Sequence, residues 1–169
     1  MSTLWLQARK RKQAHRTNIL TYTLNLGFFA GVFWSVLHWV FYVINFTEVV
    51  PGYMLEPFFT RAFLQSGWGQ AVGLAAFIAF SILAAFLYIG TLKRFRGPWA
   101  GLAYGVGWWA LIFLVIGPLA GMVLPPYRIG WDTLITEFCV YLMWGLFIGY
   151  SIAFEFHDEA SREPAANRA

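Results

Sequence analysis

The chain has 169 residues, of which 59% are hydrophobic, 20% aromatic and only 12% charged, and its net charge is +4. Soluble domains usually carry about twice that share of charged residues, so the composition excludes a soluble globular domain and indicates an integral membrane protein. The basic residues flank the apolar segments. The positive charge is therefore a topology signal, and no nucleic-acid binding is expected.

Four apolar segments are long enough to cross a membrane as helices, which takes about 20 residues each. They cover residues 19–44, 68–92, 99–122 and 131–154. We therefore predict an all-α membrane protein with four transmembrane helices in an antiparallel bundle, surrounded by the lipid bilayer. Residues 1–18 form a basic arm and residues 155–169 a polar tail in this interpretation.

The Lys and Arg residues are sorted by side. Most of them flank the same ends of the apolar segments, namely Arg9, Lys10, Arg11, Lys12, Arg16, Lys93, Arg94, Arg96, Arg162 and Arg168. Only Arg61 and Arg128 fall on the opposite side. By the positive-inside rule, both the arm and the tail are predicted to be cytoplasmic.

The first apolar segment carries Gly27, Gly31 and His38 on one helical face, at 100° per residue. This face is expected to point into the bundle, because small residues allow close helix contact in lipid. His38 lies about six residues before the outer end of the helix at Ile44, which is about 9 Å along the helix axis.

The outer connection that follows, residues 45–67, is broken by Pro51 and Gly52. Residues 56–65 begin with an early proline and place Phe59 and Phe63 on one side, so a short interfacial helix is expected in this first outer loop. The triplet at residues 45–47 matches a glycosylation acceptor, but it lies against the membrane and is given little weight.

Glycine pairs spaced four residues apart occur in all four apolar segments. The candidate helix-packing residues are Gly27, Gly31, Gly69, Gly73, Gly101, Gly105, Gly145 and Gly149. They exceed what one small bundle needs, so they could also bind a second copy of the chain or another membrane protein. The short connection at residues 93–98 predicts that the second and third helices form a hairpin, and Gly117-Pro118 predicts a kink near the end of the third.

The fourth apolar segment carries Glu137, the only carboxylate well inside an apolar segment. It shares a helical face with Tyr141 and lies about as deep as His38, so these two ionisable residues are predicted to form an intramembrane polar pair. Tyr141 or Ser35 is a possible third member. The pair could be a static hydrogen bond or a titrating pair that changes charge near neutral pH, and both possibilities stay open.

Enzymatic functions find little support. Two histidines at matching depth would be needed to hold a haem, three or four converging ligands to hold zinc, and a serine–histidine or aspartate pair on facing helices for an intramembrane protease. None of these patterns is present, so we predict no catalytic residues, no cofactor and no metal site. The single cysteine, Cys139, is expected to be a small buried hydrophobic residue.

Several segments resemble the YqhR-type conserved membrane proteins of Bacillus-like spore-forming bacteria. They are Gly31-Val32-Phe33-Trp34-Ser35, Ile44-Asn45-Phe46-Thr47, Ser81-Ile82-Leu83-Ala84-Ala85-Phe86 and Tyr141 to His157. The resemblance covers most of residues 25–157 and implies a four-helix protein of the bacterial plasma membrane. It implies no biochemical activity, and so no catalytic residue is carried over.

Two classes of function remain. The first is a non-catalytic structural or interaction module that packs through its GxxxG-type faces. The second is a component of a small proton-coupled or solute transporter that uses His38 and Glu137. A transport path needs polar groups at several depths, whereas the polar residues here gather in the outer third of the bundle. The first class is therefore favoured.

Overall fold

The computed structural model describes residues 18–92, 95 and 97–155. Within these ranges all regular structure is helical, and four helices are long and apolar enough to cross a membrane, as predicted. They are α2 (Ile19–Val43), α4 (Gly67–Leu92), the run Trp99–Ala120 and α7 (Trp131–Ala153). The predicted arm at residues 1–18 lies almost entirely outside the described residues, as does all of the tail beyond Glu155.

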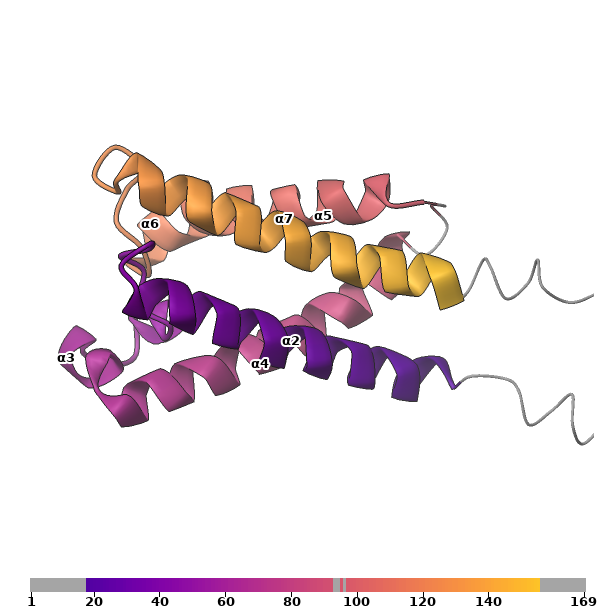
Figure 1. The fold of residues 1–169 in the computed structure, drawn as a ribbon, viewed down its shortest axis with the longest axis horizontal. Coiled ribbons are helices and arrows are strands. Elements are labelled where there is room, and N and C mark those ends of the chain that lie inside the picture. The colour runs from indigo at the N-terminus through magenta and orange to yellow at the C-terminus, as the bar shows by residue number, and fades with distance from the viewer. Residues whose placement is uncertain (1–17, 93–94, 96, 156–169) are drawn as a thin grey trace, which may run out of the picture.

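The long helices pack as two close pairs, α2 with α4 and the first part of the third helix, α5 (Trp99–Ala110), with α7 (Figure 1). α7 also contacts both α2 and α4, and so joins the two pairs. The two terminal ends of the described chain, at the start of α2 and the end of α7, lie at the same end of the molecule (Figure 1).

Glycines bring the backbones of each pair together. A β-carbon added to Gly27 of α2 would lie 2.6 Å from the α-carbon of Ile82 in α4. On the other pair, a β-carbon on Gly101 of α5 would lie 2.8 Å from the backbone oxygen of Gly145 in α7. Carbon side chains do not approach that closely, so these contacts require glycine.

The predicted hairpin of the second and third helices is looser than these two pairs. α4 and α5 meet through long aromatic side chains: the rings of Phe80 and Trp108 are 4.8 Å apart, and the Tyr104 hydroxyl donates to the Ala84 carbonyl at 2.7 Å. Gly101 and Gly105 of α5 face α7, and bulky side chains of α5 face α4. The short connection between α4 and α5 therefore does not make these two helices the closest packing partners.

The third helix changes its winding before Pro118. Residues Leu111–Ile116 form a π-helix, labelled η2, and Gly117–Ala120 continue as the short helix α6. Proline lacks an N–H group, and its ring crowds the carbonyl four residues earlier. The wider π-helical turn relieves this crowding, and it lies where the sequence predicted a kink. Gly121 then ends α6 with a left-handed φ of 70°.

The first loop, residues 44–60, folds back against the helices. Its residues 49–53 are buried, and a β-carbon on Gly73 of α4 would lie 2.5 Å from the α-carbon of Gly52. Gly73 lies about six residues, or 9 Å, along α4 from its first residue. Irregular backbone at such a depth is tolerated where protein covers it, as it does here.

The short helix expected at residues 56–65 is smaller than predicted. A 3₁₀ turn, η1 (Tyr53–Leu55), precedes it, and α3 (Arg61–Gln65) begins only after Thr60, whose backbone is extended at ψ 145°. Pro57 lies in the turn between them and does not start the helix. α3 is fixed by Leu64, which is fully buried, and Gly69 allows this close contact because its β-carbon would lie 2.5 Å from the Leu64 α-carbon.

Candidate functional site: a buried polar cluster beside a loop-lined cavity

Glu137 and His38 come together in the interior. The Nε2 atom of His38 in α2 is 2.9 Å from Oε1 of Glu137 in α7, and their side chains are 5% and 1% exposed. The contact is short, but the ring N–H does not point along it as in an aligned hydrogen bond. We therefore describe it as a short contact between two ionisable side chains. Its burial makes both side chains costly to leave without a partner.

Thr47 of the first loop makes the aligned hydrogen bond to the same carboxylate oxygen. Its hydroxyl donates to Glu137 Oε1 at 2.6 Å, and the backbone N–H of Val49 donates back to the Thr47 oxygen at 3.2 Å. One turn earlier on the same face of α7, Thr133 accepts from the backbone N–H of Glu48 at 3.2 Å. The first loop is thus attached to α7 at two points.

Tyr53 extends the cluster on the other side of His38. It is 1% exposed, its ring stands edge-on to His38 with centroids 6.0 Å apart, and its hydroxyl shares a short hydrogen bond with the hydroxyl of Tyr141 in α7. Burial, reinforced by the neighbouring Tyr141, raises the pKa of Tyr53 well above its usual value. This residue therefore stays neutral and can act as a hydrogen-bond donor.

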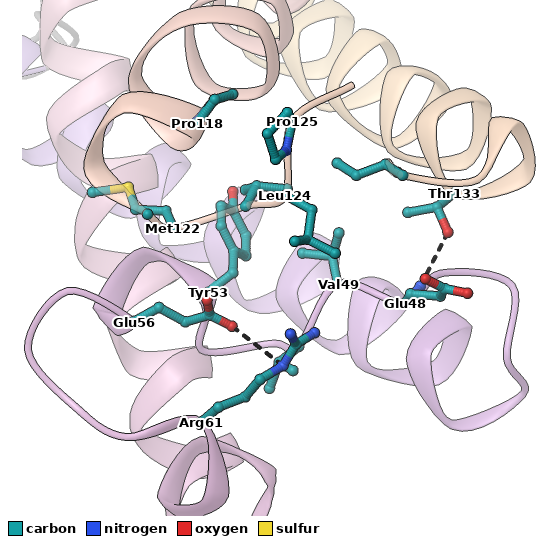
Figure 2. A pocket seen from close by; sticks show the side chains of 14 residues that line it. Glu48, Val49, Tyr53, Glu56, Arg61, Pro118, Met122, Leu124, Pro125 and Thr133 are labelled. Atoms are coloured by element: carbon teal, nitrogen blue, oxygen red, sulfur yellow. Dashed lines mark hydrogen bonds and ion pairs between the residues drawn. The ribbon is translucent and has the colours of Figure 1, made fainter. Parts of the chain in front are cut away.

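A cavity of about 200 Å³ lies against the first loop (Figure 2). Three segments that are distant in the sequence line it: the first loop with the start of α3, α6 with the turn that follows it, and the start of α7. The lining residues are Glu48, Val49, Val50, Tyr53, Glu56, Arg61, Pro118, Gly121, Met122, Val123, Leu124, Pro125, Ile129 and Thr133. Since Tyr53 belongs to both, the cavity borders directly on the buried cluster.

The charged residues of this cavity come from the loop and α3. Arg61 Nε is 3.8 Å from Glu56 Oε1, with the arginine side chain 52% and the glutamate side chain 18% exposed. Partial burial raises the pKa of Glu56, and the charge of Arg61 offsets part of that rise. A pair at this distance whose arginine is open to solvent contributes little stability. The Arg61 side chain can therefore turn toward a ligand at little cost.

The sequence suggested Tyr141 or Ser35 as a possible third member of the pair. The Ser35 hydroxyl donates to the carbonyl of Val32 at 3.1 Å, and the Tyr141 hydroxyl bonds to Tyr53. Thr47 takes that place. The sequence did draw attention to Thr47, because this residue belongs to one of the segments that resemble the YqhR family. The other motif that contains it, the glycosylation triplet, gave no indication of a contact with Glu137.

Other predicted residues also have definite positions. All eight candidate packing glycines lie against other parts of the chain. Gly69 packs against α3 and Gly73 against the first loop, whereas the other six pack against another long helix. The prediction for Cys139 is wrong: it is exposed, because it lies on the side of α7 away from Glu137. Among the residues that the structure describes, no three His, Cys, Asp or Glu side chains converge as metal ligands would.

Comparison with known proteins agrees with the resemblance. A family model described as "Conserved membrane protein YqhR" matches residues 6–167, which includes much of the arm and tail that the resemblance left out. The "Uncharacterized protein YqhR" of Bacillus subtilis (strain 168) is 38% identical over 139 residues, 82% of this chain and 78% of the relative. No solved structure matches. The chain therefore belongs to the YqhR family of conserved membrane proteins.

Proposed function

We propose that this protein is a non-catalytic structural or interaction module of the bacterial plasma membrane. Its four helices form an antiparallel bundle, and its first loop is held between them on the outer side. The observation that carries the proposal concerns Glu137, the one deeply buried carboxylate in the part of the chain that the structure describes. It accepts a hydrogen bond from the loop hydroxyl of Thr47 and also contacts His38 of another helix. The polar cluster joins segments of the chain to one another, which is a structural task.

The GxxxG-type faces support the same role. Each glycine of these faces already meets a neighbouring segment of the same chain, so the faces build the module itself. A second copy or another membrane protein would then bind a different surface, such as the lipid-facing sides of the helices or the loop end.

Transport is the second candidate, and the buried His38–Glu137 contact is what favours it. Below this pair, however, the interior is closed by aromatic rings. Phe77, Tyr141 and Trp144 pack with centroids 5.8–6.2 Å apart, and none is more than 5% exposed. A conduit needs polar groups or water at several depths, and this layer offers mainly ring surface.

A proton-flux measurement separates the two candidates. The protein is reconstituted into liposomes with a pH-sensitive dye inside, and a pH gradient is applied. If the cluster is structural, the gradient should decay at the same rate with wild type, with Glu137→Gln and with empty liposomes. A decay severalfold faster with wild type than with Glu137→Gln would favour the transporter instead.

The proposed orientation rests on the sorting of the basic residues, since Arg61 and Arg128 alone fall on the loop side. A reporter that is active only in the cytoplasm should be active when fused after Ala169 and inactive when inserted near Gly52. In this orientation the exposed rings of Phe58 and Phe59, 78% and 44% exposed, would lie in the outer leaflet beside α3. The reverse reporter pattern would contradict both placements.

A further inference from the structure

We propose that the cavity beside the first loop binds a small apolar zwitterion, a molecule that carries an ammonium group and an acidic group on an apolar body. The site goes beyond the structural role proposed above, because it gives the loop end a ligand of its own.

The size of the cavity limits the ligand. At about 200 Å³ it is smaller than the roughly 300–1,000 Å³ of sites for drug-sized molecules, so it accepts a headgroup or an amino acid but no large substrate. Its walls come from three separate segments, which favours a preformed site that does not depend on one flexible loop.

The lining supplies both halves of the recognition. Figure 2 places Glu56 and Arg61 on one side of the cavity and Glu48 beside Thr133 on another, with the apolar side chains of Val49 and Leu124 between them. Either carboxylate suits an ammonium group, and the guanidinium suits a carboxylate or phosphate. The apolar wall between them suits a hydrocarbon body. A purely anionic ligand would meet two like charges and only one favourable one.

Arg61 is well placed to accept the acidic group. Its contact with Glu56 is long, at 3.8 Å, and its side chain is half exposed, so little is lost when it turns toward a ligand. Burial raises the pKa of Glu56, and the positive charge of Arg61 offsets only part of that rise. An ammonium group would supply a second favourable charge.

Two sources offer this chemistry. One is the headgroup of a phosphatidylethanolamine lipid from the adjoining leaflet, and the other is a free apolar amino acid in solution. The test measures the melting temperature of the full chain in maltoside detergent with three probes: dihexanoyl phosphatidylethanolamine, L-leucine and, as the anion-only comparison, dihexanoyl phosphatidylglycerol. A ligand that binds the folded state raises the melting temperature.

At least one of the two zwitterions should raise the melting temperature of the wild type, and the phosphatidylglycerol should not. Which zwitterion acts identifies the source. Glu56→Gln and Arg61→Gln should each raise the apparent dissociation constant by about tenfold or more, because each removes one charge-assisted contact. The matched controls are Asp132→Asn and Arg128→Gln, which change exposed charges that do not line the cavity, and these should respond like wild type.

Three results would overturn the proposal. They are no shift in melting temperature with either zwitterion, an equal shift with the phosphatidylglycerol, or a wild-type response in both cavity variants. Should Glu56→Gln fail to fold, Glu48→Gln replaces it, because Glu48 is exposed and bonds to Thr133 through its backbone N–H, which the substitution leaves in place.

Discussion

Gly105→Ala should lower the free energy of unfolding by about 1–3 kcal/mol, the usual range for forcing extra atoms into a packed interior. The added β-carbon would collide with the backbone oxygen of Tyr141 and lie 3.0 Å from the α-carbon of Leu142. Backbone atoms of α7 cannot turn aside as a flexible side chain can, so α5 and α7 must separate. Unfolding by denaturing detergent from mild micelles measures the change.

Gly107→Ala is the matched control, two residues further along the same helix. A β-carbon there meets nothing within 4 Å. Alanine is favoured over glycine inside a helix by about 0.5–1 kcal/mol, so this variant should be as stable as wild type or slightly more stable. Equal destabilisation of both variants would mean that α5 and α7 do not pack through Gly105.

The buried pair gives the second large effect. His38→Ala and Glu137→Gln should each destabilise strongly, by about 3–5 kcal/mol if the remaining partner is left buried and charged. Because the side chains touch, the double variant should be less destabilised than the sum of the two single changes, by about 1 kcal/mol or more. Melting curves of the three variants and wild type in detergent give this coupling energy.

A matched cycle uses a polar side chain buried elsewhere. Ser81 in α4 is fully buried and accepts a hydrogen bond from the indole N–H of Trp144 at 3.0 Å. Trp144 lies about two helical turns along α7 from Glu137, so this bond is separate from the His38 contact. His38→Ala and Ser81→Ala should therefore be additive. Additivity in the His38–Glu137 cycle as well would show that the pair contributes no mutual stabilisation.

The parts of this fold that follow a helical period could be predicted from sequence. The four spans agree with the structure to within two residues at each end, because the length of an apolar run sets where a membrane helix begins and ends. His38 and Glu137 could be placed together for the same reason: a fixed rise and rotation per residue converts sequence position into depth and face.

The first loop could not be predicted in this way. Thr47 and Tyr53 reach the cluster through irregular backbone, where no period relates residue number to position. The turn that redirects the chain depends on Asn45, which adopts a left-handed φ of 60° that few non-glycine residues adopt. Which neighbouring helices pack most closely could not be predicted either, since glycine spacing shows that a helix packs closely but does not identify its partner.

The central claim is that the first loop folds back between the helices and is held there by Glu137. Thiol labelling of solubilised protein in a Cys139→Ala background tests it most directly. Val50 is 1% exposed and Thr60 is exposed, so Val50→Cys should resist a maleimide that reacts readily with Thr60→Cys. Adding Thr47→Val, which removes the bond to Glu137, should make Val50→Cys reactive. Labelling of Val50→Cys as fast as Thr60→Cys, with Thr47 intact, would contradict the claim.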